Sequence, residues 1–577
     1  MKKCLLSVAA VIMSATMLAV TPATFEVRNL QTGAEDCTSP LPNEMAACAM
    51  IYGDYDNDGD LDLFYIGGQN SDRQYVGLLQ NNNGVYTKVE LSEDFQSLQQ
   101  ASAAWIDYNN DGNLDLVLVG SMDGTSTITM VMKNLGAAEN YAFEEDMDNY
   151  LPGIYGEGND NTQHSIAVID YNNDGWMDIV LTGNAGAKWD GEHGRLTALF
   201  RNNKGVFEFA DGKATIGAEV FDQINGGGIT VGDANNDGYM DILVTGYSDI
   251  ALKSDGETQG NGAVYMYLND GKGSFTKADI AFDHAQNQGI AFFADVNNDG
   301  WNEIIELGRD LNNGWNNAAS VWMNNNGTFT KLDSCGLTGG QAVVSVGDVN
   351  NDGFMDFAYI GWPTQVIAYG SGDGVFTEVA YKDCGLADIC ARGGAMNLVD
   401  LNGDKTLDVQ TSGWSDLNSG WRDGEAINKI ETANQAPSVP VNVTVAETAN
   451  GYDLSWEAAT DDHTPAAALR YNVYVKNADG QVWMLNPADL ATGAQKVAGG
   501  YVNYLNTTKY HFNIPAGTYT FGVQAIDQAN ACSAFVSPNM SAVDNVSVTT
   551  ECVKVFENGE FYIQKDGVKY SILGQIR

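Results

Sequence analysis

Short apolar runs and polar turns alternate along most of this chain, and the same order returns several times. An apolar run such as residues 103–106 leads into an acidic loop, and a second apolar run at 115–119 follows and ends at a glycine. A third run, as at 197–200, precedes a glycine turn and a fourth run, as at 205–209. Runs of this length bounded by turn residues indicate β-strands. Each unit is therefore predicted to contain four short strands.

The acidic loop between the first two strands recurs seven times, at intervals of 52 to 63 residues. A four-stranded unit of this length cannot bury both faces of its sheet alone, so neighbouring units must pack on one another. Radial packing of such units into a propeller meets this need and leaves only short sheet edges. The predicted fold class is therefore all-β, with a seven-bladed β-propeller as its largest part.

Oxygen-bearing side chains occupy positions 1, 3, 5 and 9 of each loop, and a glycine occupies position 6 in six of the seven copies. Alternate residues of a tight loop converge on one point, so they can surround a hard cation, and the glycine permits the bend. A single copy could be an ordinary turn between strands, but sevenfold recurrence favours calcium. The predicted ligands, loop by loop, are Asp54, Asp56, Asp58, Asp62, Asp107, Asn109, Asp111, Asp115, Asp170, Asn172, Asp174, Asp178, Asp233, Asn235, Asp237, Asp241, Asp295, Asn297, Asp299, Glu303, Asp348, Asn350, Asp352, Asp356, Asp400, Asn402, Asp404 and Asp408.

The seventh loop departs from this pattern, because Gly403 stands at position 4 and Lys405 takes position 6. We expect a different backbone bend there, with a cationic side chain beside the site, and consider this loop the weakest of the seven. The expected cofactor is structural Ca²⁺, up to seven ions.

The seventh unit offers a third strand at residues 426–430 and then leaves the pattern without a fourth strand. Residues 24–27, near the amino terminus, have the missing strand pattern. We predict that they complete the seventh unit and close the ring.

Acidic residues outnumber basic ones by 75 to 29, which gives a formal net charge of −46. The loop positions contribute 22 of the acidic residues, and seven calcium ions would leave a net charge of about −32. Nucleic acid and anionic membranes are poor partners for such a chain, because like charges repel.

Residues 1–23 have a short basic start, an apolar middle and a small residue at the end, which is typical of a secretory signal peptide. No later apolar run is long enough to span a bilayer. We therefore predict a monomer that is secreted, at the cell surface or in the periplasm.

Residues 24–432 resemble the FG-GAP or VCBS repeats of integrin α-subunit propellers and of many exported bacterial proteins. In that family the acidic loops lie on one face and ligands commonly meet the opposite face. The resemblance implies a surface binding or adhesion protein that recognises a glycan or a surface protein. The residues expected at the opposite face are Trp189, His193, Tyr247, Arg309, Trp315, Trp362, Trp414 and Trp421. Aromatic rings and hydrogen-bonding groups suit a sugar, although such tryptophans also pack between blades.

The alternative function is a polysaccharide lyase or hydrolase on the same face, because some rhamnogalacturonan lyases resemble this design. Asp190 and Glu192 beside His193, and Asp310 beside Arg309, are the acid–base candidates. The five histidines have no zinc spacing, and the sequence contains no nucleophile elbow and no phosphate-binding glycine loop. A binding protein is therefore favoured over an enzyme.

Beyond a linker at 433–438, the strand pattern continues to the carboxyl terminus. Residues 436–545 resemble a fibronectin type III sandwich with Trp456 in its core, which implies a stalk that spaces or presents its neighbour. Residues 550–577 indicate a hairpin with turns at 558–559 and 566–567. This tail also resembles the sorting tails of secreted Bacteroidetes proteins, and both interpretations stay open.

Overall fold

The structure is a computed structural model, and it divides the chain into two compact units, Met1–Ser537 and Pro538–Arg577. The residues that it describes are 20–28, 48–68, 75–123, 126–155, 164–185, 195–209, 221–248, 261–282, 286–310, 314, 316–361, 364–387, 389, 394–415, 419–431, 433–498, 503–538, 552–557, 560–565 and 568–571. Most of the predicted signal peptide, residues 1–19, lies outside this set.

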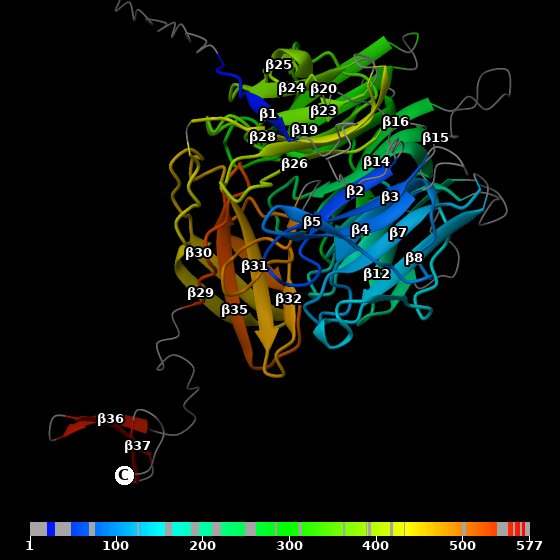
Figure 1. Cartoon of the computed structure of the whole chain (residues 1–577). Helices are drawn as coiled ribbons and strands as arrows, with labels where there is room; N and C mark the ends of the chain where they lie inside the picture. Colours follow the sequence, from blue (N-terminus) through cyan, green and yellow to red (C-terminus); the bar gives the residue numbers. More distant parts are fainter. Residues whose placement is uncertain are drawn as a thin grey trace, which may run out of the picture. The chain divides into compact units, whose positions relative to one another are not determined.

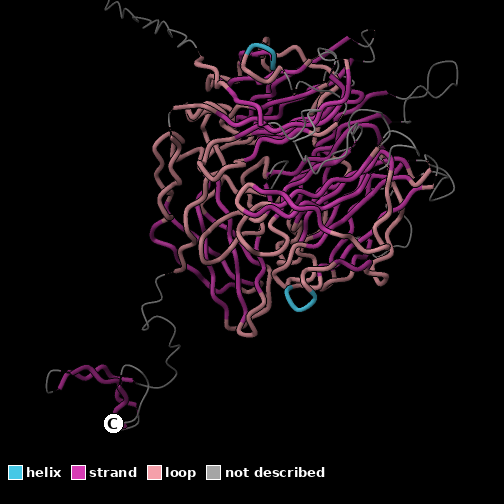
Figure 2. Tube along the Cα trace, viewed as in Figure 1, coloured by secondary structure: helices cyan, strands magenta, loops and turns pink. Residues whose placement is uncertain are grey.

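Regular structure in the described ranges is almost entirely β (Figure 2). The exceptions there are two short 3₁₀ turns, Ala137–Glu139 and Tyr381–Asp383. The predicted all-β fold class is therefore confirmed.

The first unit contains a series of antiparallel sheets, and most of them have four strands in sequence order (Figure 1). The first four sheets consist of β2 (Cys48–Gly53), β3 (Asp62–Gly67), β4 (Tyr75–Asn82) and β5 (Val85–Val89); β6 (Gln99–Ile106), β7 (Asp115–Ser121), β8 (Thr127–Asn134) and β9 (Phe143–Glu145); β10 (Ile166–Ile169), β11 (Asp178–Asn184), β12 (Arg195–Asn202) and β13 (Phe207–Phe209); and β14 (Ile224–Gly232), β15 (Asp241–Ser248), β16 (Asn261–Asn269) and β17 (Phe275–Lys277).

Three further sheets of the same kind follow. They consist of β18 (Gln286–Ala294), β19 (Glu303–Asp310), β20 (Asn316–Asn325) and β21 (Thr328–Lys331); β22 (Val343–Val346), β23 (Phe357–Ile360), β24 (Gln365–Gly370) and β25 (Phe376–Ala380); and β26 (Met396–Val399), β27 (Asp408–Ser415), β28 (Gly420–Asn428) and β1 (Phe25–Arg28).

The first strand of each sheet contacts the first strand of the next sheet, and β26 contacts β2 in turn. The side-chain amide of Asn397 in β26 also donates a 3.0 Å hydrogen bond to the carbonyl of Met50 in β2. The sheets therefore follow one another in a closed, propeller-like series, which we call the ring. Apolar side chains fill the spaces between neighbouring sheets, as where Val117 and Val131 meet Ile179 and Leu181.

The strand β1 completes the last sheet, as the sequence predicts. It pairs antiparallel with β28, with Phe25 opposite Asn428 and Val27 opposite Ala426. Phe25 is buried and packs with residues of the sixth and seventh sheets, including Tyr369 and Leu398. The amino-terminal strand therefore fastens the end of the ring to its beginning.

Phe25→Ala is expected to destabilise the ring by about 3 kcal/mol, because it removes a buried aromatic side chain from a closing strand. Denaturant unfolding measures this difference. Glu26→Ala is the control, because Glu26 is exposed and its ion pair with Lys429 lies at the surface; such pairs contribute little to stability. Equal stability of the two variants would contradict the role of β1.

Residues 433–498 and 503–537 contain two three-stranded sheets, and we call these residues the two-sheet segment. One sheet contains β29 (Val441–Thr448), β30 (Gly451–Glu457) and β34 (Lys509–Phe512), and the other contains β31 (Arg470–Asn477), β32 (Val482–Met484) and β35 (Tyr519–Ile526). Trp456 lies in the core between them, as predicted. This core continues into the ring, where Tyr171 and Val231 belong to the same cluster.

The two-sheet segment is therefore not a stalk that stands away from the ring (Figure 1). A two-residue strand, β33 (Val497–Ala498), even pairs with β2 and adds a fifth strand to the first sheet. The expectation that this segment is a separate spacer is therefore wrong where it contacts the ring. The segment docks there because docking buries apolar surface on both parts.

The second unit contains an antiparallel three-stranded sheet of β36 (Cys552–Glu557), β37 (Glu560–Lys565) and β38 (Val568–Ser571).

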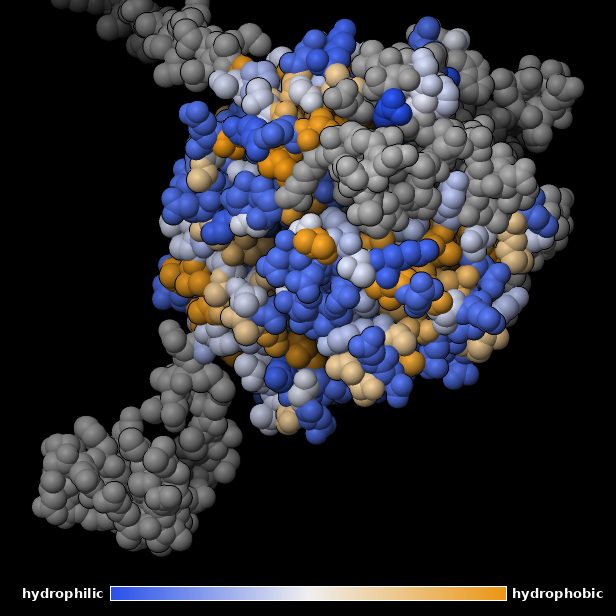
Figure 3. Space-filling view, in the orientation of Figure 1, coloured by the Kyte–Doolittle hydropathy of each residue, from blue (hydrophilic) through white to orange (hydrophobic). Residues whose placement is uncertain are grey.

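In the first unit, the face seen in Figure 3 is largely hydrophilic, with small apolar patches. Among the described residues, no helix has the length and apolar character needed to cross a membrane.

Candidate metal centres

Each acidic loop connects the first and second strands of one sheet. In the third sheet, for example, Asp170 directly follows β10 and Asp178 is the first residue of β11. All seven loops therefore lie at the same end of the ring, which we call the loop face.

Inside a loop, the side-chain oxygens turn inward and accept backbone hydrogen bonds. In the third loop, the N–H of Asp174 donates to Asp170 Oδ1 at 3.1 Å and to Asn172 Oδ1 at 3.0 Å. The N–H of Gly175 donates to Asp170 Oδ2 at 2.8 Å, and that of Trp176 donates to Asp174 Oδ1 at 3.0 Å. These bonds orient the oxygens of positions 1, 3 and 5 toward the inside of the loop.

The carboxylate at position 9 is fully buried in every loop; these residues are Asp62, Asp115, Asp178, Asp241, Glu303, Asp356 and Asp408. In the first loop, Asp62 Oδ2 accepts a bond from the N–H of Tyr55 at 3.1 Å, and Oδ1 accepts one from the N–H of Asn81 at 2.8 Å. The position 9 side chain thus ties the loop to the third strand of its own sheet.

Burial makes these carboxylates reluctant to ionise. It raises the pKa of Asp62 and of Glu303 to about 8, even though backbone N–H groups oppose the shift. It also raises the pKa of Asp233, at position 1 of the fourth loop, to about 7. In the third loop, burial and the charge of Asp170 hold the pKa of Asp178 well above its usual range. A cation inside the loop would offset this accumulation of negative charge.

The first loop gives the most direct test of whether a cation fits. Oxygens of Asp54, Asp56 and Asp58 lie within 4.8 Å of one another. Among the described residues, buried Asp56 Oδ1 has no hydrogen-bond partner. An all-oxygen donor set with unsatisfied carboxylate charge fits a hard divalent cation such as calcium.

The seventh loop has the same bend as the others, so the expectation of a different bend is wrong. Gly403 at position 4 has φ 76° and Lys405 at position 6 has φ 65°. The corresponding residues of the third loop, Asn173 and Gly175, have φ 55° and 83°. Both positions require left-handed backbone, and the seventh loop merely exchanges which of them carries glycine. Its carboxylates keep the same backbone bonds, as where the N–H of Lys405 donates to Asp400 Oδ2 at 2.7 Å.

Asparagine at position 4 of the loops was missed as a functional residue. In the second to fifth loops its side-chain amide donates to the carbonyl of the position 6 glycine in the next loop. The bonds run from Asn110 to Gly175 at 3.2 Å, Asn173 to Gly238 at 3.1 Å, Asn236 to Gly300 at 2.8 Å and Asn298 to Gly353 at 2.8 Å. The signal in the sequence is asparagine at this position in six of the seven loops. The loops are therefore linked to one another along the ring.

The aromatic and polar residues predicted for the opposite face are only partly described. Arg309 and Trp414 lie near the far ends of β19 and β27, away from the loops, and both are partly buried. The backbones of Tyr247 and Trp421 lie at the same end, and Trp421 pairs with Trp414. The remaining predicted residues lie outside the described ranges; these are Trp189, His193, Trp315 and Trp362, together with Asp190 and Glu192.

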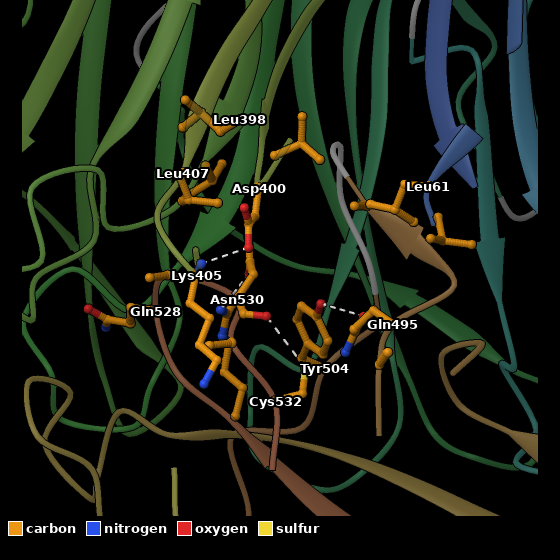
Figure 4. A pocket seen from close by; sticks show the side chains of 18 of the residues that line it. Leu61, Leu398, Asp400, Lys405, Leu407, Gln495, Tyr504, Gln528, Asn530 and Cys532 are labelled. Carbon is orange, nitrogen blue, oxygen red and sulfur yellow. Dashed lines mark hydrogen bonds between the residues drawn. The ribbon is translucent and has the colours of Figure 1, made fainter. Parts of the chain in front are cut away.

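A cavity of about 720 Å³ lies between the ring and the two-sheet segment (Figure 4). The seventh loop lines one side through Asp400 and Lys405, and Arg470 and Tyr504 line the other. The guanidinium of Arg470 lies 4.6 Å from the centre of the Tyr504 ring. The sequence did not indicate this cavity, because it exists only where the two parts meet.

A model of the FG-GAP-like repeat matches residues 54–118, 170–244 and 245–306. Human integrin alpha-6 is 28% identical over 200 residues, and the match covers 31% of this chain and 17% of that protein. The chain therefore spans less than a fifth of the length of this relative.

Solved structures with a loosely similar arrangement include an Agrocybe aegerita lectin, described as recognising non-reducing terminal N-acetylglucosamine. Its TM-score is 0.36 at 18% identity, covering 60% of this chain and 82% of that one. A rhamnogalacturonan lyase has a TM-score of 0.35 at 12% identity, covering 72% and 71%. Similarities this low carry no functional argument. The repeat matches and the loop geometry together show that this chain contains FG-GAP-like repeats, and part of it is similar to an integrin α-subunit.

Proposed function

We propose that this chain is a calcium-stabilised, seven-bladed FG-GAP propeller that acts outside the cell or at its surface as a binding or adhesion protein. Calcium ions in the acidic loops would be structural, because each loop joins two strands and concentrates buried carboxylates. The partner would be a glycan or a surface protein, bound at the face opposite the loops.

The observation that carries this proposal is the packing of the two-sheet segment on part of the loop face, where the position 6 glycines of the third to sixth loops are buried. Backbone hydrogen bonds connect the two parts, including one of 2.8 Å from the N–H of Asp54 to the carbonyl of Lys496. The part of the loop face that is buried against the segment cannot also receive a large partner. This supports the opposite face, where Arg309 and Trp414 lie, as the ligand-binding surface.

A glycan array probed with the protein in calcium, and again in excess chelator, tests this function. We expect calcium-dependent binding, and we expect Arg309→Ala to weaken it about tenfold, as is common for an arginine at the centre of an interface. Lys429→Ala is the control, because it removes a positive charge near the loop face. Equal loss in both variants would argue against the assigned face.

The alternative function, a polysaccharide lyase or hydrolase, is tested by incubating the protein with pectic and host polysaccharides. Release of shortened products that is lost in Arg309→Ala would replace the binding proposal with an enzymatic one. A blank array without turnover would direct the search to protein ligands.

A further inference from the structure

The two-sheet segment bonds to the backbone of the acidic loops themselves. The N–H of Asp348, at position 1 of the sixth loop, donates to the carbonyl of Gln528 at 2.8 Å. The N–H of Asn513 donates to the carbonyl of Asn173 in the third loop at 2.7 Å. These bonds require the loop backbones to be held in one conformation.

Side chains of the segment also follow the shape of the loops closely. Gln528 is fully buried, and its amide donates to Asn298 Oδ1 in the fifth loop at 2.7 Å. The ring of Trp483 lies so close to Gly175 that a Cβ there would be 2.8 Å from Trp483 Cγ. A Cβ on Gly353 of the sixth loop would lie 2.1 Å from the carbonyl oxygen of His463.

Contacts of this kind require each acidic loop to keep the compact conformation in which its side-chain oxygens turn inward, which we call the closed form. Within each loop, buried carboxylates face one another, and their mutual repulsion opposes the closed form unless a cation offsets it. Any ligand that favours the closed loops therefore favours docking of the segment, and docking must raise the affinity of that ligand by the same factor.

We propose that the two-sheet segment is a calcium-dependent clamp on the loop face, an inference that rests on the proposed calcium sites. With calcium bound, the loops present the backbone that the segment binds. Without calcium, the segment releases from the loops while its own two sheets stay folded.

Hydrogen exchange of the whole chain, with calcium and with excess chelator, tests the clamp. Removing calcium is expected to increase exchange at least tenfold at the amides of Asp348 and Asn513, which bond across the interface. Amides inside the segment, in β31 and β35, are expected to keep their protection. Unchanged interface amides, or loss of protection in β31 and β35 at the same calcium concentration, would overturn the proposal.

Calcium affinity, measured by equilibrium dialysis with ⁴⁵Ca²⁺, tests the reciprocal effect. Gln528→Ala removes a contact to the fifth loop and is expected to weaken calcium binding at the affected sites about fivefold. Gln481→Ala, on an exposed turn of the same segment, should leave the affinity unchanged.

Alanine substitutions at two loop glycines distinguish an effect on docking of the segment from an effect of backbone strain inside the loop. Gly353→Ala and Gly238→Ala have nearly the same backbone, with φ 85° and 90°, but a Cβ on Gly238 meets nothing within 4 Å. Only Gly353→Ala is expected to increase exchange at the interface amides in calcium. If the chain binds no calcium, the proposed metal sites fail. If calcium binds, but Gln528→Ala and Gln481→Ala have the same calcium affinity and Gly353→Ala and Gly238→Ala have the same exchange at the interface amides, the clamp proposal alone fails.

Discussion

In excess chelator, the protein is expected to melt at a temperature lower by about 10 °C or more than in millimolar calcium. The reason is that folding then buries the position 9 carboxylates without a counter-ion. Asp62, Asp178 and Glu303 are fully buried, and burial raises the pKa of each of them. A ligand that binds only the folded chain stabilises it by about 2.7 kcal/mol per site at a hundredfold excess over Kd. Calcium bound in several loops therefore accounts for a large difference in melting temperature.

Differential scanning calorimetry measures this effect, and added calcium should restore the original melting temperature. Magnesium at the same concentration is the control, because it requires smaller octahedral sites and gives up its water reluctantly. An unchanged melting temperature in chelator would contradict structural calcium in these loops. Equal rescue by magnesium would show that the loops do not select calcium.

The ring was predictable because its signals are local and repeated. Each acidic loop stands between two apolar runs, and seven copies set the number of units. The closing role of β1 could also be inferred, because the seventh unit has no fourth strand of its own and residues 24–27 supply one. Pairing of Phe25 with Asn428 confirms this inference.

The seventh loop was misjudged because one substitution was considered alone. Gly403 and Lys405 exchange the residue types found at positions 4 and 6 of the other loops, and left-handed backbone at both positions keeps the bend. The asparagine links between loops were overlooked for a related reason. Asn110 and Asn173 bond to glycine carbonyls 65 residues further along the chain, and such pairs are visible only once neighbouring sheets are placed side by side.

Docking of the two-sheet segment could not be predicted from strand patterns. An alternating strand indicates which face is buried, but it does not indicate whether the covering surface comes from the same sheet pair or from another part of the chain. Tyr171 in the third loop and Trp456 in the segment share one core. Their common cluster depends on shape complementarity between distant segments, which leaves no periodic signal.

Asp62→Asn is expected to change stability in opposite directions with and without calcium. In calcium, the variant loses a negatively charged ligand and should be less stable by about 3 kcal/mol, which follows from weaker occupancy of the first loop. In chelator at pH 7.5, the variant should be more stable by about 1 kcal/mol, since it removes a fully buried acidic group beside other carboxylates.

The sign in chelator follows from the pKa of Asp62, which burial raises from an ordinary 3.8 to about 8. At pH 7.5 the unfolded chain carries this group ionised, so calcium-free folding must either protonate it or bury its charge, and both oppose folding. Asparagine avoids that cost and still offers one oxygen to the N–H of Tyr55 or Asn81, which bond to Asp62.

Urea unfolding of the variant and the native chain, in calcium and in chelator, measures both differences. Asp270→Asn is the control, because Asp270 is exposed in a turn and its carboxylate accepts bonds from the N–H groups of Lys272 and Ser274. The change that Asp270→Asn makes in the free energy of unfolding should have the same sign in calcium and in chelator. Destabilisation of Asp62→Asn by the same amount with and without calcium would mean that Asp62 acts only as a hydrogen-bond acceptor. Reversal of the sign would instead tie the buried carboxylate of the first loop to a bound cation.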